Sequence, residues 1–241
     1  QQENQQENQQ ENQQEQPTEE ETSSPALLGT PAPAAALAAA DSHDSHCICG
    51  KTHTAIGNHK TENANAFNGA VALWDNGGTL MNGDSEWKVD EGTGYLKLEA
   101  GKYYLSTNLT LNAPIGICGT NVTLCLNGKT ITVKEGSKPR CVIMVDKDNS
   151  SNKGHLTLTD CSENNDGTIS GGDYEAVEIL SGSNLDMYGG TITGSSKGVD
   201  ISSSAFNMYG GTISGNSGCG VMMAAGTFKM SGGFISNNPG R

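Results

Sequence analysis

The sequence predicts an all-β protein whose main part is a parallel β-helix with three short strands in each coil of about 22 residues. Three observations lead to this fold class. A phrase is repeated three times between Asn184 and Asn238, apolar residues inside each repeat alternate with polar ones, and pairs of glycines recur at equivalent positions.

The repeated phrase begins at Met187, Met208 and Met230, which are 21 and 22 residues apart. It reads MYGGTITG at residues 187–194, and its other copies occupy residues 208–215 and 230–237. A partial copy, GTIS at residues 167–170, precedes the equivalent residues 190–193 by 23 positions. A period of this length indicates a solenoid of stacked repeats.

The apolar residues of each repeat have a period of two, which is typical of strands and not of helices. No stripe at helical spacing is long enough to support ankyrin, tetratricopeptide or armadillo repeats. Equivalent residues of successive coils should stack about 4.8 Å apart and fill the interior. The predicted ladders are Val177/Val199/Val221, Ile179/Ile201/Met223, Leu185/Phe206/Phe228, Met187/Met208/Met230 and Ile192/Ile213/Ile235.

The paired glycines predict the corner before the third strand of each coil. They are residues 189 and 190, 210 and 211, and 232 and 233. We expect at least one glycine of each pair to have a positive φ, where a Cβ would cost energy.

Composition agrees with a β-solenoid. The chain holds 32 Gly among 241 residues, and only 5% of its residues are aromatic. The formal net charge is −13, but seven of the 27 acidic residues lie within residues 1–24, which contain no Lys or Arg. The rest of the chain therefore has 20 acidic and 14 basic residues and no basic stripe, which argues against nucleic-acid binding. No apolar run reaches the length of about 18 residues that a membrane span needs.

Residues 1–46 are predicted to form a disordered tether. Gln/Glu/Asn repeats and an Ala/Pro-rich stretch fill most of this segment, so it has little apolar surface to bury. An alternative reading makes Leu27 to Ala40 part of a signal peptide, although its prolines and the absence of a basic flank disfavour this.

A cluster of Cys and His follows the tether. Four of the five His and two of the seven Cys fall between His43 and His59. Thiolates and imidazoles at this density suit tetrahedral zinc, and we expect Cys47, Cys49, His53 and His59 to hold a structural Zn²⁺. The alternative is a reduced or disulfide-prone Cys pair beside a solvated linker, because the Cys-x-Cys spacing is not that of a zinc knuckle.

Residues 47–102 are predicted to contain this motif and an irregular N-terminal cap. An open end of a β-helix exposes strand edges and apolar interior, so we expect Trp74 or Trp87 to cover it. Residues 66–74 read as one or two helical turns. A tryptophan that serves as a platform for a sugar ring is the functional alternative.

Residues 103–241 are predicted to form the parallel β-helix. Its first strands are expected at residues 103–105, 108–111, 122–126, 130–133, 142–145 and 156–159. The chain stops at Arg241 in the middle of a coil, with no polar cap, which predicts that it is the N-terminal part of a longer solenoid.

Three phrases of the sequence resemble those of secreted or wall-attached right-handed β-helix proteins of Gram-positive gut bacteria. They are LTLTDC at residues 156–161, FNMYGGTISGN at residues 206–216 and CICG at residues 47–50. The resemblance covers roughly residues 47–241. It implies the right-handed, pectate-lyase-like fold and an extracellular location, but it does not distinguish adhesins from polysaccharide lyases.

Catalytic motifs of β-helix enzymes are not evident. A hydrolase needs two carboxylates across the scissile bond, and the sequence lacks both an Asp-Asp pair and an Asn-Thr-Asp motif. A lyase would use Ca²⁺, for which Asp146, Lys147 and Asp148 form the only suggestive stretch, and His155 lies in an isolated Gly-His pair. The outward ladders Glu178/Asp200/Met222 and Asp186/Asn207/Lys229 show no repeated acid pair.

The remaining cysteines, residues 118, 125, 141, 161 and 219, have irregular spacing, and the total of seven is odd. We expect them to be mostly reduced and partly buried. A single bridge between Cys118 and Cys125 is the alternative.

These observations favour a non-catalytic extracellular binding or adhesion module, secreted or attached to the cell wall. Its expected partner is a host or dietary glycan or a glycoprotein such as mucin or immunoglobulin, and Asp146, Lys147, Asp148 and His155 are the candidate ligand-binding residues. The alternative is a polysaccharide lyase or glycoside hydrolase of the β-helix type, with Ca²⁺ as cofactor only in the case of a lyase. No other cofactor is expected beyond the structural zinc.

Overall fold

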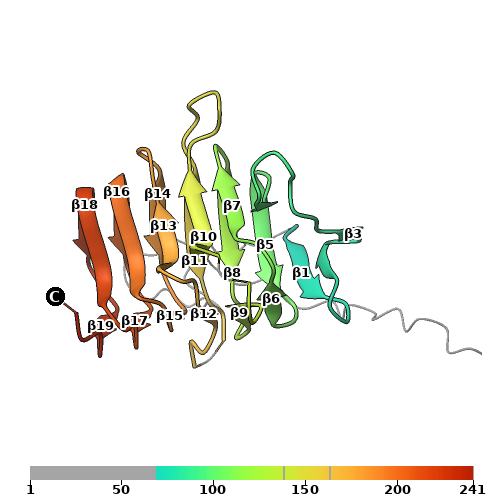
Figure 1. Ribbon diagram of the computed structural model, residues 1–241. Coiled ribbons are helices and arrows are strands. Elements are labelled where there is room, and N and C mark those ends of the chain that lie inside the picture. The colour runs from blue at the N-terminus through green and yellow to red at the C-terminus, as the bar shows by residue number, and fades with distance from the viewer. Residues whose placement is uncertain (1–68, 138, 163, 241) are drawn as a thin grey trace, which may run out of the picture. The chain divides into compact units, whose positions relative to one another are not determined.

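The computed structural model describes residues 69–137, 139–162 and 164–240 (Figure 1). These residues form 19 strands and no helix. The all-β prediction is therefore confirmed for this part of the chain, and the parallel strands are stacked as in a β-solenoid. The predicted tether and the candidate zinc ligands lie outside the described residues.

Except for two short antiparallel strands at the N-terminal end, the strands fall into three rows, and each complete coil contributes one strand to each row. The first row consists of β4 (Leu96–Lys97), β7 (Ile115–Cys118), β10 (Cys141–Asp146), β13 (Glu175–Ile179) and the N-terminal halves of β16 (Lys197–Met208) and β18 (Cys219–Met230). The second consists of β1 (Val71–Asp75), β5 (Gly101–Leu105), β8 (Asn121–Cys125), β11 (His155–Thr159), β14 (Asn184–Met187) and the C-terminal halves of β16 and β18. The third consists of β6 (Leu109–Leu111), β9 (Thr130–Val133), β12 (Thr168–Ser170), β15 (Thr191–Thr193), β17 (Thr212–Ser214) and β19 (Phe234–Ser236).

Pairing within each row is parallel throughout. The first two rows belong to one 13-stranded sheet, because β16 and β18 run through both, whereas the third row is a separate six-stranded sheet. β16 bends where it passes from one row to the next, at a register shift near Ser203, whose φ is +54°.

The five predicted ladders are confirmed by the strand register. Val177 pairs with Val199 and Val199 with Val221, and the other four ladders align in the same way. All their members up to residue 213 are completely buried, and Phe206 stacks on Phe228 with ring centroids 5.1 Å apart. Period-two alternation therefore places one apolar side of every strand in the interior.

The predicted glycine corners are also confirmed. Gly190, Gly211 and Gly233 have φ values of +82°, +81° and +85°. A Cβ on Gly211 would lie 2.7 Å from the carbonyl oxygen of Gly190 in the preceding coil and 2.6 Å from Cε of Met187. Both the backbone conformation and the close stacking therefore require glycine at this position.

Replacing Gly211 with Val should lower the free energy of unfolding by at least about 1 kcal/mol, because it adds backbone strain and a steric clash. Urea denaturation monitored by circular dichroism measures the change. Gly136→Val is the matched control, since Gly136 also has a positive φ of +79° but has no atom within 4 Å of the added Cβ. Equal losses for the two variants would contradict the stacking argument.

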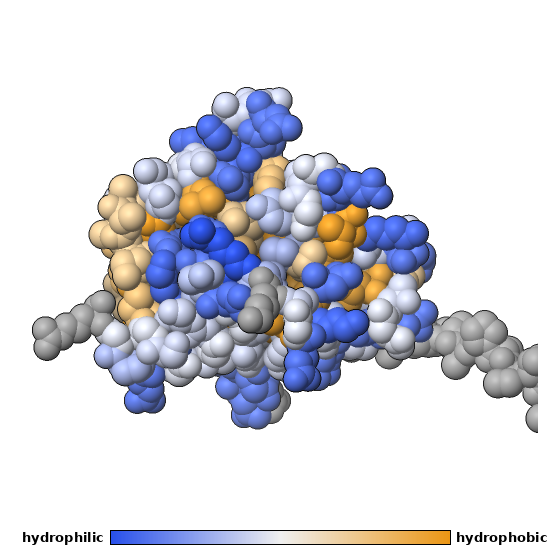
Figure 2. Space-filling view, viewed as in Figure 1, coloured by the Kyte–Doolittle hydropathy of each residue, from blue (hydrophilic) through white to orange (hydrophobic). Residues whose placement is uncertain are grey.

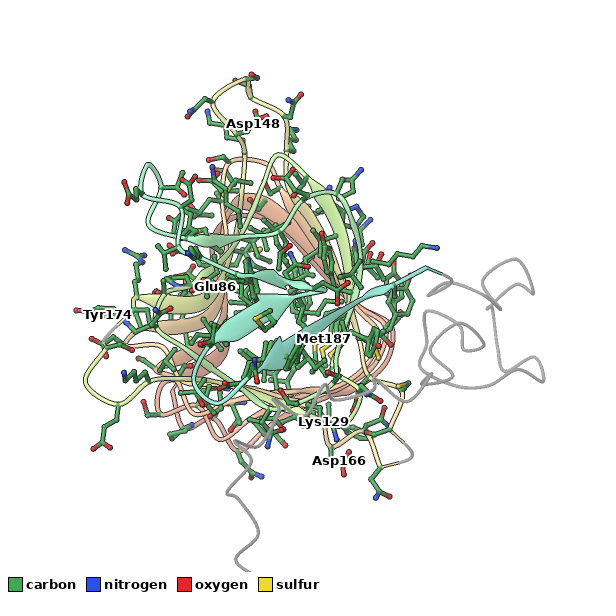
Figure 3. The ribbon with its side chains drawn as sticks, turned by 90° about the vertical axis from the view of Figure 1, so that its right-hand side faces the viewer. Glu86, Lys129, Asp148, Asp166, Tyr174 and Met187 are labelled. Atoms are coloured by element: carbon green, nitrogen blue, oxygen red, sulfur yellow. The ribbon has the colours of Figure 1, made fainter. Side chains whose placement is uncertain are left out.

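The N-terminal end differs from the expectation in two respects. No helical turn forms in the described part of residues 66–74; instead Val71–Asp75 is strand β1, because Val71, Ala72 and Leu73 continue the ladder of β5. The parallel stack thus begins before residue 103. β1 then pairs antiparallel with β2 (Leu80–Asn82), and β2 with β3 (Ser85–Glu86), and these strands lie across the end of the stack (Figure 3).

Trp87 completes this cap, as predicted. It is 7% exposed and belongs to the central apolar cluster, and its indole N–H donates to the carbonyl oxygen of Lys97 at 2.8 Å. Trp74 is half-buried and donates to the carbonyl oxygen of Gly83. The alternative of a sugar platform is therefore wrong for Trp87, whose ring is enclosed.

The last coil leaves apolar side chains exposed along β18 and β19, at the end of the stack that is opposite the cap (Figure 2). The exposed residues are Met222, Met223, Met230, Phe234 and Ile235. Phe234 also interrupts the row of outward Thr side chains formed by Thr168, Thr191 and Thr212.

The alternative of a bridge between Cys118 and Cys125 is wrong. Cys118 ends a strand of the first row and Cys125 ends a strand of the second row, and both are thiols. Cys125, Cys141 and Cys219 are buried reduced residues, as expected. Burial raises the pKa of the Cys141 thiol to about 12, so this group stays neutral and packs as a small apolar side chain.

Candidate functional site

The predicted ligand residues at 146–148 lie where β10 ends and a loop leaves the stack (Figure 3). The carboxylate of Asp148 organises this loop. Its Oδ1 accepts hydrogen bonds from the backbone N–H groups of Ser150 and Asn152, both at 2.8 Å, and its Oδ2 accepts one from Nδ2 of Asn152. The hydrogen bond from the Asn152 side chain lowers the pKa of Asp148, so the loop contains a fixed negative charge at neutral pH.

His155 does not join these residues. It lies at the start of β11, and its Nε2 is 3.0 Å from Oδ2 of Asp186 on β14. Oδ1 of Asp186 accepts a hydrogen bond from Nδ2 of Asn207 at 2.8 Å. Burial opposes ionisation of Asp186, but the hydrogen bonds from His155 and Asn207 outweigh it and lower its pKa. The four predicted residues therefore belong to two different sites.

Asp146, Lys147 and Asp148 border an open cleft of about 320 Å³ above β4 and β7. Its opposite wall comes from the segment that precedes β4, where Tyr95 packs directly on Gly116. A Cβ on Gly116 would lie 2.7 Å from Cβ of Tyr95, so glycine at this point of β7 creates the space in which the tyrosine lies. We refer to this feature as the Tyr95 cleft.

The Tyr95 cleft combines an aromatic side chain with hydrogen-bonding groups of several kinds. Tyr95 is half-buried, and burial is the main cause that raises its pKa, so its hydroxyl is a neutral donor and acceptor. The other polar side chains that line the cleft are Thr93, Lys97, Glu99, Thr120, Asp146, Lys147, Asp148 and Asn149. An aromatic ring surface with hydrogen-bonding side chains beside it is a combination that sugar-binding sites present.

A second group of charged residues was not identified in the sequence. On the outer side of the first row, five side chains form a continuous chain of ion pairs, here called the charge network. They are Arg140, Glu175, Glu178, Lys197 and Asp200. Arg140 contacts Glu178 through Nη2 at 2.8 Å and Nε at 3.1 Å, and its Nε lies 3.3 Å from Glu175.

Lys197 connects the other end of the network. Its Nζ lies 3.0 Å from Oε1 of Glu175 and 2.5 Å from Oδ2 of Asp200. The side chains of Glu175 and Glu178 are 1% and 5% exposed. Desolvation raises the pKa of Glu178 although Arg140 opposes the shift, whereas the hydrogen bond to Asp200 is the main cause that raises the pKa of Lys197.

The ladder Glu178/Asp200/Met222 was predicted correctly. It was not recognised from the sequence that Glu175 adds a third carboxylate beside Glu178 and Asp200, or that Arg140 and Lys197 pair with these groups. The 22-residue offset between Glu175 and Lys197 was a signal that could have revealed the pairing. Each carboxylate is bound to a cation, so the network has the chemistry of a structural element and not of a free acid–base pair.

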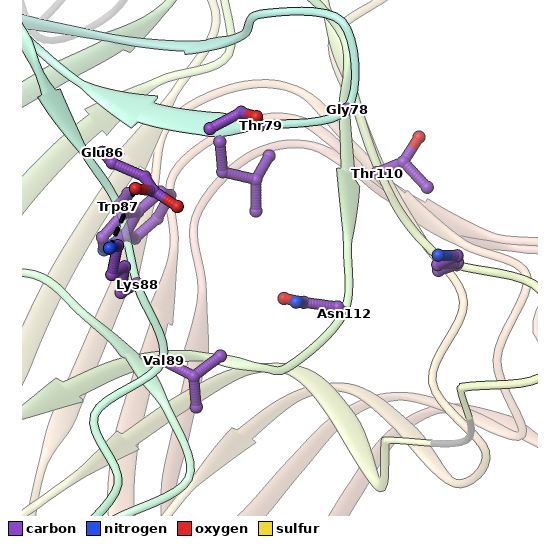
Figure 4. Close-up of a pocket in the computed structure, with 10 residues that line it drawn as sticks. Gly78, Thr79, Glu86, Trp87, Lys88, Val89, Thr110 and Asn112 are labelled. Atoms are coloured by element: carbon purple, nitrogen blue, oxygen red, sulfur yellow. Dashed lines mark ion pairs between the residues drawn. The ribbon is translucent and has the colours of Figure 1, made fainter.

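A pocket of about 250 Å³ lies between the cap and the first coil (Figure 4). Glu86 and Lys88 form an ion pair of 2.9 Å at its edge, with both side chains more than half exposed. Thr79, Thr110 and Asn112 also line it, whereas the ring of Trp87 is turned to the core. The pocket lacks an exposed aromatic face, so the Tyr95 cleft is the better candidate for ligand binding.

The chain matches no protein-family model, and no curated protein or solved structure is significantly similar to it. Among the described residues, no group of three or more His, Cys, Asp or Glu side chains is arranged to hold a metal ion. The predicted zinc ligands Cys47, Cys49, His53 and His59 lie outside those residues, so the zinc site stays a prediction. Residues 69–137, 139–162 and 164–240 also include no helix of the length and hydropathy needed to cross a membrane.

Proposed function

We propose that this protein is a non-catalytic carbohydrate-binding module built on a right-handed parallel β-helix. The right hand follows from the strong preference of parallel strand crossovers for that sense. The observation that supports binding is the Tyr95 cleft, which is lined both by an aromatic side chain and by the loop that carries Asp146, Lys147 and Asp148.

A glycan suits the composition of this cleft. Sugar hydroxyls pair well with carboxylate, amide and ammonium groups, and the C–H face of a sugar ring packs on an aromatic side chain. The loop is held in shape by the carboxylate of Asp148, so little ordering is needed when a ligand binds. The cleft is open, which favours an extended or terminal glycan over a small molecule that must be enclosed.

Binding is favoured over the lyase or hydrolase alternative by the state of the acidic residues. A glycosidase requires one carboxylic acid and one carboxylate that both reach the substrate. In the charge network the carboxylates are instead paired with Arg140 or Lys197, and Glu175 and Glu178 are almost completely buried. Such groups stabilise the stack and are not available to a sugar.

The cellular setting is part of the same proposal. The resemblance to secreted β-helix proteins of gut bacteria and the polar N-terminal segment support an extracellular position, secreted or attached to the cell wall. The proposed partner is a host or dietary glycan or a glycoprotein such as mucin or immunoglobulin. A structural zinc at Cys47, Cys49, His53 and His59 belongs to this proposal, because the Cys/His motif contains the ligand types that zinc prefers.

A glycan array followed by calorimetric titration of the best ligand tests this function. We expect Tyr95→Ala to weaken binding about tenfold, because it removes the ring surface on one side of the cleft. Tyr174→Ala is the matched control, since Tyr174 is 60% exposed and lies outside the cleft. Release of products from pectin or mucin polysaccharides, without stable binding, would contradict the proposal and favour the enzyme.

A further inference from the structure

Two tyrosines of the repeated phrase stack on the outer surface, away from the Tyr95 cleft. Tyr188 and Tyr209 follow β14 and β16 in successive coils, and their rings are 4.6 Å apart at an angle of 19°. Their backbone N–H groups donate to the carbonyl oxygens of Leu158 and Met187 in the preceding coils, so the coil spacing fixes the ring spacing. The outer ring, Tyr209, is 44% exposed.

The tyrosine ladder stops at the next coil. Met230 pairs with Met208, which places Ser231 at the position equivalent to Tyr209, and the N–H of Ser231 donates to the carbonyl oxygen of Met208. Tyr188 covers one face of the Tyr209 ring. On the side of the next coil the equivalent residue is Ser231, whose side chain is only a hydroxymethyl group. The third copy of the phrase has Ser in place of Tyr, so it supplies no ring to stack on Tyr209 from that side. We call the space between Tyr209 and Ser231 the slot.

Hydrogen-bonding groups lie beside this slot. Asp186, Asn207 and Lys229 form the adjacent ladder on the same outer side of the second row. Nδ2 of Asn207 is used by Asp186, which leaves its Oδ1 as an acceptor. Lys229 is exposed and makes no ion pair with any described residue, so its ammonium group is available as a donor.

We propose that the slot between Tyr209 and Ser231 binds a pyranose ring as the third member of the stack. Its C–H face packs on Tyr209 and its hydroxyls pair with Asn207, Lys229 and Ser231. Sugars with an unbroken C–H face, such as β-glucose and β-galactose units, fit this geometry, because bulky axial substituents would prevent close contact with the ring. The site is separate from the Tyr95 cleft and does not depend on it.

The test uses the full chain with cellotetraose and β-1,4-galactotetraose as probes. Saturation-transfer difference NMR detects contact between sugar C–H protons and the protein, and titration calorimetry gives the affinity. We expect Tyr209→Ala to weaken binding of at least one probe about fivefold to tenfold, and Tyr209→Phe to retain it.

Ser231→Tyr supplies the decisive variant, because it adds a ring and leaves Tyr209 in place. The new ring should occupy the slot and abolish binding there, while circular dichroism shows an intact fold. Tyr95→Ala should leave this binding unchanged, which separates it from binding in the cleft. The proposal is overturned if neither probe binds the unmodified chain, or if Tyr209→Ala and Ser231→Tyr both leave the affinity unchanged.

Discussion

Replacing Lys197 with Met should lower the free energy of unfolding by about 3 kcal/mol, because it leaves Glu175 and Asp200 as buried carboxylates without their shared cation. Glu175 is 1% exposed and keeps only the contact of 3.3 Å to the exposed guanidinium of Arg140. Urea unfolding at pH 7 measures the loss. The apolar Met side chain fills most of the space of Lys, so a cavity contributes little to the effect.

Lys88→Met is the matched control, since Lys88 pairs with Glu86 at the surface and both side chains are more than half exposed. The Lys88→Met variant should lose less than about 1 kcal/mol of its free energy of unfolding.

The difference in free energy of unfolding between the unmodified protein and Lys197→Met should also depend on pH. The raised pKa of Lys197 means that its contribution is complete below the ordinary lysine pKa of about 10.4 and decreases as pH rises through the folded-state value. A loss equal to that of the control would show that the charge network does not stabilise the stack.

Removing the carboxylate of Asp160 should have an effect of similar size. This residue is 1% exposed, and its two oxygens accept hydrogen bonds from the backbone N–H groups of Gly128 at 2.7 Å and Gly167 at 2.8 Å. Its Oδ2 also accepts one from the hydroxyl of Ser162 at 2.7 Å. Asp160→Ala leaves these donors unpaired at a buried corner, so we expect a loss of about 3 kcal/mol in urea unfolding.

Asp160→Asn should lower the free energy of unfolding by less than Asp160→Ala, because the amide oxygen still accepts one of these hydrogen bonds. Asp166→Ala provides the control in the same loop, since the side chain of Asp166 is exposed. If Asp160→Ala and Asp166→Ala had the same stability, the corner would be held by the strands alone.

The regular coils could be predicted from the sequence because their residues recur at nearly constant spacing. Once Val177, Val199 and Val221 are recognised as one ladder, the register of every neighbouring position follows, including the outward Glu178 and Asp200. The glycine corners follow from the same spacing. A period of two and a constant coil length are sufficient to define these positions.

The first coils could not be predicted in the same way. From Ile143 to its ladder partner Val177 the chain takes 34 residues instead of 22, because loops of different length leave the stack between the strands. Strand β7, in which Gly116 interrupts the apolar run, was not recognised, and the helical expectation near Trp74 was wrong. The Tyr95 cleft forms between these irregular parts, so no repeat spacing indicated that Tyr95 and Asp146 would line the same cleft.

Arg140 illustrates a second limit. It pairs with Glu178, which is 38 residues away, and it lies outside any ladder of the repeat. Its role depends on the path of the segment that precedes β10, which sequence periodicity does not determine. The same reasoning applies to His155. It was named with Asp146, Lys147 and Asp148 as a candidate ligand-binding residue, but it pairs with Asp186 on the next strand of the stack.

Chemical-shift mapping with the best ligand from the glycan array tests glycan binding in the Tyr95 cleft most directly. Backbone amide signals of Gly116, Gly119, Thr120, Lys147 and Asn149 should shift on titration, because these residues line the cleft. Signals of Glu175, Glu178 and Asp200 should stay in place. The claim would be contradicted if no array ligand bound, or if the shifts centred on the charge network while the cleft residues did not respond.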